Sequence, residues 1–537
     1  MLDRIANGCK PARESFCLDS VFTLGENMDD LKGQKTLILS ENSPDILREK
    51  VRSYFHKTYS IDERLYDILA DDDAFYLRAD PLRHPLVFYL GHTAVFYMNK
   101  LNIARIVEHR INPSFESMFA VGVDEMSWDD LNMAHYNWPD IPKVKEYRHL
   151  VRDFVDSLIT ELPLTDEGIT WDSPWWAIVM GIEHQRIHLE TSSVLIRQLP
   201  LEKVKQLDFW SICPDSGAAP ANSLLPVQGG EVILGKHRTD PLYGWDNEYG
   251  SKSFKVEDFL ASKYLVSNEE FLEFVQTGAY HIQRYWTEEA WAWKQYQGAE
   301  HPRFWIKAAD GTFSLRTIAS VVPMPWNHPV EVNYLEAKAF CNWKAEKLGM
   351  PIRLPSEAEW YCLRDRHVHT DQAYWDKAPA NINLEYWASA CPIDRFAFDE
   401  FFDIIGNVWQ WTETPICGFL GFKVHPYYDD FSVPTFDGRH NLIKGGSFIS
   451  TGNEAIRDSR YAFRRHFYQH AGFRYISSDA VLETENDLYE NDPEIVPWCD
   501  LDWDSEFHKW LLEAIKQHFG KRGKALHLGC KTGRISF

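Results

Sequence analysis

The sequence predicts a multidomain protein in which an all-α helical bundle precedes an α+β part with much irregular structure. Long stretches with helical apolar periodicity fill residues 42–200. Short strand-like runs among Trp- and Tyr-rich loops follow from residue 227 onward. The 537 residues are enough for about three or four domains. At 45% hydrophobic and 25% charged residues, the composition is that of a globular protein with a sizeable core.

Four segments of the first part have the periodicity of amphipathic or buried helices. In the last of them, we expect Ser173 as the N-cap, Pro174 as the first helical residue and Pro200 as the stop. Four helices joined by modest loops predict a bundle, a fold that builds metal sites from inward-facing side chains. The predicted helices are 43–70, 85–107, 146–162 and 174–199.

The rest of the chain divides by composition. Residues 1–41 form an N-terminal extension, 42–200 the bundle, and 201–226 a linker rich in small residues and proline. Residues 227–478 form the α+β domain, with strands expected within 229–236, 253–267 and 441–450. Residues 479–537 open acidic and form a third segment.

Charge and cysteine usage limit the partners and the compartment. A net charge of −23 argues against nucleic-acid or anionic-membrane partners. The start of the chain lacks the apolar core of a signal peptide, and no run is long enough to span a bilayer. Nine cysteines without a CxxC motif suggest reduced thiols. We therefore expect a cytoplasmic protein.

The segment "GIEHQRIHLETSS" looks like half of a metal site. His184 and His188 are four residues apart and share one helix face, so both imidazoles can reach one ion. The zinc-protease pattern needs a glutamate after the first histidine, but Gln185 stands there, which argues against peptide hydrolysis. Glu190 lies about 200° around the helix from His188 and is expected to be a packing carboxylate.

A third ligand is sought among His84, His92 and His135 of the bundle. His92 lies in the apolar "FYLGHTAVFY", where Gly91 leaves room for close approach of another helix. Taken alone, each of these histidines is better explained as a hydrogen-bonded core or loop residue than as a ligand. Three neutral imidazoles would suit iron, zinc, copper or nickel, and would leave coordination positions open for substrates or dioxygen.

These motifs carry a family resemblance. "FYLGHTAVFYMNKL" and "EHQRIHLETSSVLIRQLP" resemble the DinB-like bundle of the nonheme-iron sulfoxide synthases. "RLPSEAEWYCL", "GNVWQWTET", "LIKGGSF" and "AGFRY" resemble the C-type-lectin-like domain of formylglycine-generating enzymes. The resemblance covers most of residues 42–476, and the combination in this order is more specific than any single motif. It is strongest to the ovothiol-pathway branch, the 5-histidylcysteine sulfoxide synthases.

The resemblance implies an O₂-dependent oxidoreductase with iron(II), Fe(2+), held by His92, His184 and His188. It would join the sulfur of L-cysteine to the imidazole of L-histidine, giving 5-histidylcysteine sulfoxide. The alternative is an ergothioneine-type enzyme acting on trimethylhistidine with cysteine or γ-glutamylcysteine. In this family a tyrosine of the second domain faces the iron as a proton donor. The matching stretch "FKVHPYYDDFSVPTF" indicates Tyr427, with Tyr428 as the alternative.

Two departures bear on the substrates. Ergothioneine-type enzymes carry a glutamine where this chain has Ile187, and a Trp–Asp pair where it has Tyr461 and Ala462. With the neighbouring Arg460, Arg464 and Arg465, this segment is expected to bind substrate carboxylates, although arginines also occur on solvated loops. The departures fit free histidine and cysteine better than a trimethylated substrate.

The last residues also carry a resemblance. "ALHLGCKTGRISF" (525–537) is similar to the first strand and glycine loop of S-adenosylmethionine methyltransferases, with Lys531 in place of a glycine. A full nucleotide-binding sheet needs more chain, so we expect a truncated or vestigial domain without methyltransferase activity.

Three rival interpretations stay open. A formylglycine-generating oxidase would need copper-binding cysteines, which "GGSFISTGNEAIRDSRY" lacks. A DinB-type zinc thiol transferase fused to a binding module is the second. The third is a lectin-like binding protein without catalytic activity.

Overall fold

The computed structural model describes residues 28–41, 43–120, 137–429 and 431–482. His135 and the tail segment 525–537 lie outside the described residues, so the expectations attached to them stay expectations. The described chain forms one unit up to Ser478.

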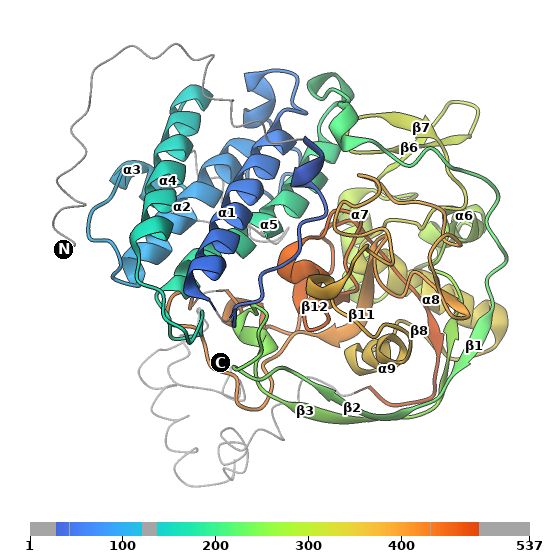
Figure 1. Cartoon of the computed structure of the whole chain (residues 1–537). Coiled ribbons are helices and arrows are strands. Elements are labelled where there is room, and N and C mark those ends of the chain that lie inside the picture. Colours follow the sequence, from blue (N-terminus) through green and yellow to red (C-terminus); the bar gives the residue numbers. More distant parts are fainter. Residues whose placement is uncertain (1–27, 42, 121–136, 430, 483–537) are drawn as a thin grey trace, which may run out of the picture. The chain divides into compact units, whose positions relative to one another are not determined.

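The four predicted bundle helices are present and lie side by side (Figure 1). α5 starts one residue later than predicted, because Pro174 occupies the cap position and the Trp175 N–H approaches the Ser173 hydroxyl oxygen at 3.3 Å. α4 starts earlier than predicted, and the short α3 was not predicted at all. The helices are α1 (Pro44–Tyr66), α2 (Leu86–Ile103), α3 (Pro113–Met118), α4 (Ile141–Glu161) and α5 (Trp175–Gln198).

Glycines allow close packing around α2 and α5. A Cβ on Gly181 of α5 would lie 2.4 Å from the ring of Tyr97 on α2. A Cβ on Gly91 would lie 2.7 Å from the Phe119 ring, which confirms that this glycine permits a close approach. Since almost all residues of both helices are buried, polar side chains on them must find partners inside the protein.

The second part has the predicted α+β character, with small sheets and long connections (Figure 1). Its two four-stranded sheets have the orders β1-β4-β15-β8 and β13-β12-β11-β14. The helices are α6 (Asn268–Gln276), α7 (Glu288–Gln297), α8 (Tyr334–Leu348) and α9 (Glu357–His367). The strands are β1 (Leu224–Val227), β2 (Gly230–Leu234), β3 (Lys252–Val256), β4 (Phe259–Ser262), β5 (Trp305–Lys307), β6 (Phe313–Arg316), β7 (Val321–Pro323), β8 (Ile352–Arg353), β9 (Ala397–Phe398), β10 (Phe401–Phe402), β11 (Trp409–Pro415), β12 (His440–Lys444), β13 (Tyr461–Arg464), β14 (Ala471–Gly472) and β15 (Ile476–Ser477).

Two predicted segment boundaries differ from the structure. β1 begins inside the predicted linker 201–226 and pairs with β4, so the end of that linker belongs to a sheet. Part of the predicted extension 1–41 also packs on the second domain: the Leu39 N–H donates to the Pro241 carbonyl at 2.7 Å, and the Thr36 N–H donates to the Gln372 side chain at 2.7 Å.

α5 is shared by the bundle and the second domain. Glu190 accepts hydrogen bonds from the Trp409 indole at 2.6 Å and from the Ser447 and Ser450 hydroxyls at 3.0 and 2.6 Å. Glu183, seven residues earlier, accepts from the Asn453 N–H at 2.8 Å. Glu190 is therefore a packing carboxylate, as expected, and it holds the metal-site helix against the second domain.

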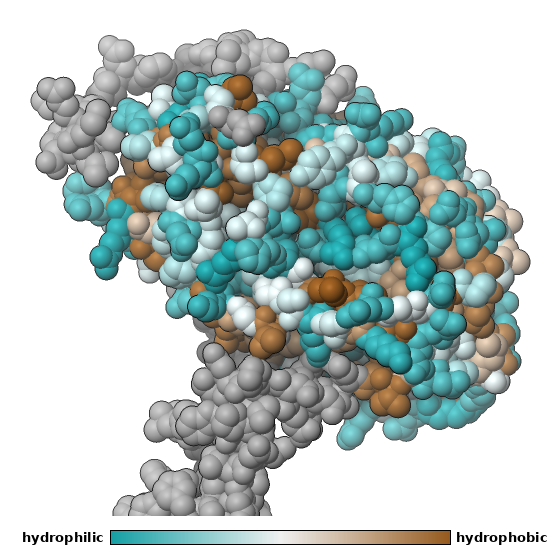
Figure 2. Space-filling view, turned by 60° about the horizontal axis from the view of Figure 1, so that its bottom comes forward, coloured by the Kyte–Doolittle hydropathy of each residue, from teal (hydrophilic) through white to brown (hydrophobic). Residues whose placement is uncertain are grey.

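The described surface agrees with the charged composition. The face drawn in Figure 2 is largely hydrophilic, with hydrophobic residues in scattered patches. Among the described residues, none of the helices is both long and apolar enough to cross a membrane.

Candidate metal centre

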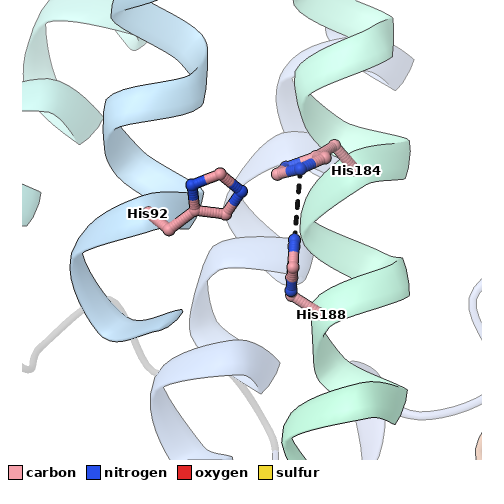
Figure 3. Close-up of side chains that lie close together, drawn as sticks. All are labelled: His92, His184 and His188. Atoms are coloured by element: carbon pink, nitrogen blue, oxygen red, sulfur yellow. Dashed lines mark hydrogen bonds between the residues drawn. The ribbon is translucent and has the colours of Figure 1, made fainter. Parts of the chain in front are cut away.

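Three imidazole rings converge between α2 and α5 (Figure 3). His92 comes from α2, and His184 and His188 come from successive turns of α5. One ring nitrogen of each lies within 4.8 Å of the others, and the Nε2 atoms of His184 and His188 are 3.1 Å apart. The structure thus brings together the three histidines that the sequence singled out.

Each ring has a second contact that holds it. The Nδ1 of His92 lies 2.6 Å from the Phe119 carbonyl oxygen, so Nδ1 carries the proton and Nε2 is left as a ligand atom. The Nδ1 of His188 lies 3.4 Å from the Thr191 hydroxyl. The His184 ring is stacked on Phe96, with centroids 3.6 Å apart. These contacts order the rings before any ion arrives.

Burial keeps the site in the protonation state that metals require. Desolvation lowers the pKa of His184 well below its usual value, and the neighbouring His188, His92 and Lys100 lower it further. A neutral imidazole is the form that coordinates a metal.

The donor set fits a transition metal. Two ligand nitrogens at about 2.1 Å from one ion and at roughly a right angle are about 3 Å apart, close to the observed 3.1 Å between the His184 and His188 nitrogens. The cluster offers three protein ligands, the number typical of catalytic metal sites, which keep a position open for substrate. This arrangement suits an ion that binds substrates better than a closed tetrahedral structural site.

The other histidine considered as a ligand lies elsewhere. His84 packs against Phe88 and Trp138, with ring centroids 4.4 and 6.0 Å away, and does not belong to the cluster.

Of the two expected tyrosines, the structure places Tyr428 beside the triad. Its ring centroid is 5.0 Å from that of Phe96 and 6.2 Å from that of His184. Tyr427 instead lies beside His425, 4.8 Å away, and its N–H donates to the Nδ1 of that ring at 3.1 Å. The preference for Tyr427 is therefore corrected in favour of Tyr428: adjacent residues of this turn point in different directions.

A lysine that the sequence reasoning did not single out also faces this region. Lys100 is buried, and its Nζ lies 3.7 Å from the ring centroid of Tyr428 and 5.0 Å from that of Phe96. His92, Phe96 and Lys100 are spaced four residues apart on α2 and so share one face. From this spacing, the position of Lys100 on the same helix face as His92 could have been predicted from the sequence.

The predicted substrate-binding segment is only partly available to a substrate. Arg460 is buried and forms a bidentate pair with Glu357, with N–O distances of 3.0 and 3.1 Å. The Tyr461 hydroxyl donates to Asn453 and accepts from the Trp245 indole, both at 2.7 Å. Both side chains therefore belong to the domain core, and the guanidinium of Arg460, from which carboxylate binding was expected, is already paired with Glu357.

The two other predicted contact residues are half-buried. Ile187 lies between the two histidines of α5 in sequence and packs against the apolar core. Arg464 lies on β13 opposite His440. Arg465 is paired with Glu289 at 2.8 Å.

Comparison with known families agrees with this architecture. Residues 60–192 match the DinB superfamily, and residues 213–478 match the family described as sulfatase-modifying factor enzyme 1-like domain. The chain has the domain composition of a sulfoxide synthase. It is an enzyme of the oxidoreductase class. The three clustered histidines lie in the DinB-type part, and Tyr428 lies in the second part.

Curated relatives cover both parts of the chain. The chain is 26% identical to hercynine oxygenase of Mycolicibacterium smegmatis, over 72% of this chain and 89% of that protein. It is 25% identical to ergothioneine biosynthesis protein 1 of Schizosaccharomyces pombe, over 76% of this chain, and spans only 52% of that longer protein. Formylglycine-generating enzyme of Mus musculus is 24% identical but matches only 44% of this chain.

Proposed function

We propose that the chain uses an iron(II) ion, held by His92, His184 and His188, to join a cysteine-type thiol to the imidazole ring of a histidine derivative. O₂ is the oxidant, and the product is a sulfoxide. The observation that carries this proposal is the convergence of three imidazole nitrogens within 4.8 Å, from the buried His184 and His188 and the half-buried His92, with a phenol and an ammonium group beside them.

The reaction balances with one molecule of O₂. The thiol S–H and one imidazole C–H bond break, and a C–S and an S–O bond form. One oxygen atom enters the sulfoxide and the other leaves as water, so the four electrons that O₂ takes up come from the new C–S bond and from sulfur. Iron(II), when bound, supplies the place where O₂ and the sulfur meet and lowers the pKa of the thiol.

The protein's own residues shield the site from water and supply a proton to the reaction. Phe96 covers one face of His184 and keeps water from that ring. Tyr428 offers a phenol on the side of the triad that the second domain covers, where it can deliver a proton to the departing oxygen. Holding the thiol and the imidazole ring next to each other removes the need for the two substrates to meet by diffusion in the right orientation.

Two imidazole substrates are compared. Trimethylhistidine (hercynine) is the first candidate, because the relatives that align over most of their own length are named hercynine oxygenase. Free L-histidine, coupled to L-cysteine as in the ovothiol pathway, is the second. It is favoured by Ile187, which stands where ergothioneine-type enzymes carry a glutamine.

The test is product analysis from iron-loaded protein. Protein loaded with iron(II) under argon receives L-cysteine or γ-glutamylcysteine with hercynine or L-histidine, then air, and the products are identified by mass spectrometry. We expect one coupled sulfoxide, carrying label from ¹⁸O₂. The combination that gives it fastest names the substrates. Absence of O₂ uptake and of any coupled product with all four combinations would overturn the proposal.

A further inference from the structure

A cavity lies beside the last turn of α5, away from the triad. Its volume is about 240 Å³, below the roughly 300–1,000 Å³ of pockets for drug-sized molecules, so it has room for a small ligand only. Arg197, one of its lining residues, is nine residues beyond His188, or roughly 13 Å along the helix axis. The three histidines and Tyr428 are not among the lining residues. The cavity is therefore separate from the candidate metal centre.

A buried ion pair forms part of the cavity wall. Arg197, from α5, and Glu331, from the second domain, both line the cavity, and their side chains are 3% and 5% exposed. The Nη1 of Arg197 donates to the Oε2 of Glu331, and its Nε donates to the Arg316 carbonyl at 2.7 Å. Among the described residues, no acceptor lies within hydrogen-bond distance of the Arg197 Nη2, and no donor within that distance of the Glu331 Oε1. The pair therefore keeps one donor group and one acceptor for a ligand.

The charges around this pair favour a ligand that brings a carboxylate. Burial alone would raise the pKa of Glu331, but the charge of Arg197 and the hydrogen bond from His470 outweigh it and lower the pKa to about 2, so Glu331 is ionised. A second guanidinium lies next to the pair: the Nε of Arg316 donates to the Arg197 carbonyl at 3.1 Å. Asp215, which also lines the cavity, is already paired with an exposed arginine. Two buried guanidiniums thus accompany one buried carboxylate.

Much of the remaining wall is apolar. It is built from the segment before β1, the β6–β7 hairpin and the loop after β12, through Ile212, Leu315, Ile318, Val322 and Phe448. A ligand that fills the cavity therefore needs an apolar body in addition to the groups that bind the ion pair.

We propose that this cavity binds a small α-amino acid with an apolar side chain, whose carboxylate pairs with Arg197 and whose ammonium pairs with Glu331. Such a ligand brings one charge of each sign on neighbouring atoms, so neither member of the buried pair is left facing a like charge. Because Arg197 belongs to the helix of His184 and His188, and Glu331 to the second domain, the ligand connects the two parts of the chain. The site is additional to the proposed function and does not depend on it.

The experiment compares L-leucine with two counterparts that each lack one charge. L-Leucine, 3-methylbutylamine (no carboxylate) and 4-methylpentanoate (no ammonium) are titrated by calorimetry into iron-loaded protein under argon. We expect L-leucine to bind and each counterpart to bind at least about tenfold more weakly. The melting temperature should rise with the concentration of L-leucine, because the ligand binds only the folded protein.

Ser216→Trp tests the place of binding. Ser216 is exposed and lines the cavity, so an indole there fills its mouth without removing a buried contact, and L-leucine should bind at least about tenfold more weakly. Ser223→Trp is the matched control. Ser223 is also exposed and lies in the same segment before β1, but it does not line the cavity, so affinity should stay within about threefold of wild type.

Glu331→Gln tests the recognition of the ammonium. The amide oxygen can still accept from Arg197, while the charge that attracts the ammonium is gone. L-Leucine should bind about tenfold more weakly, and 4-methylpentanoate should stay within about threefold or bind more tightly. Glu336→Gln, which replaces another buried glutamate of the second domain outside the cavity, should change neither affinity.

Three results would overturn the inference. The first is the absence of L-leucine binding up to about 10 mM, a concentration well above the range of specific small-ligand sites. The second is binding that survives Ser216→Trp and is displaced by L-cysteine, which would place L-leucine at the triad. The third is equal affinity for L-leucine and 3-methylbutylamine, which would show that only the apolar body is recognised. Each of them leaves the proposed function untouched, because that is measured by product formation.

Discussion

α2 and α5 both carry histidines of the cluster, but they differ in what else they contact. On α5, Glu183 and Glu190 bond the second domain, and Arg197 pairs with Glu331 there. These three residues are spaced by seven, which gives one stripe along the helix. On α2, the stripe that starts at His92 points into the site itself. α5 therefore carries both cluster histidines and the contacts to the second domain. α2 carries the third histidine and the side chains next to the cluster, Phe96 and Lys100.

The largest effect should come from replacing a histidine of the cluster, because the site needs nitrogens from both helices and fails when one is removed. His184→Ala removes one of three nitrogens, and we expect iron retention after dialysis to fall below about a tenth of the wild-type stoichiometry, with loss of turnover. Metal analysis by mass spectrometry of protein loaded under argon measures this directly.

His84→Ala is the matched control for this prediction. It removes a buried histidine close to α2 that lies outside the cluster. It should keep the metal. Iron loss in His84→Ala together with retention in His184→Ala would mean that the ligand set is a different one.

The second prediction breaks only the docking side of α5. Glu190→Ala leaves the Trp409 indole and two serine hydroxyls buried without their acceptor, so we expect a loss of about 3 kcal/mol or more in the free energy of unfolding. Iron should still bind, since all three ligands belong to the bundle, while turnover falls because the second domain is displaced. Thermal unfolding, iron content and product formation separate these effects.

Glu190→Gln sharpens this second prediction. Its amide oxygen can still accept one or two of the bonds, so the loss should be smaller than for alanine. A Glu190→Ala protein as stable as the wild type would contradict the docking role.

The third prediction tests what the second domain adds to the triad. Tyr428→Phe should reduce coupled product by about 10- to 100-fold and shift the products toward oxidised thiol, because proton delivery is lost. Tyr427→Phe should stay within about threefold of wild type, since that ring faces His425. Product ratios by mass spectrometry distinguish them, and the reverse order of effects would return the role to Tyr427.

The sequence predicted the parts of the site that follow from helical periodicity. It predicted less well the side chains whose positions depend on contacts with residues far away in the sequence. Helical spacing predicted the bundle and the His184–His188 pair, but the glycine that lets α5 approach α2 is Gly181, whereas Gly91 makes room for Phe119. It could not tell Tyr427 from Tyr428, since the direction of a side chain in a turn depends on tertiary packing. It also could not see that Arg460 is neutralised by Glu357, 103 residues away.

The last prediction concerns a pH-dependent contribution to the docking side of α5. Asn453, whose N–H binds Glu183, also donates its side-chain amide to Glu248 at 3.0 Å. Burial raises the pKa of Glu248 to about 7, above its ordinary value of 4.5. The folded protein therefore binds this proton more tightly than the unfolded chain, and stability falls as pH rises from about 4.5 to 7, by on the order of 3 kcal/mol.

Glu248→Gln removes that titration, so the melting temperature of the variant relative to wild type should rise between pH 5 and pH 8. Glu336→Gln is the control: burial also raises the pKa of Glu336 to about 7, but this residue caps α8 and contacts Tyr280 instead of Asn453. Both variants should flatten the stability profile, whereas only Glu248→Gln should change the pH dependence of turnover through α5. A difference between variant and wild type that stays constant with pH would show that Glu248 does not titrate in this range. The hydrogen bond from Asn453 to Glu248 would then support the Glu183 contact of α5 equally at every pH, and the docking of α5 would carry no pH dependence from Glu248.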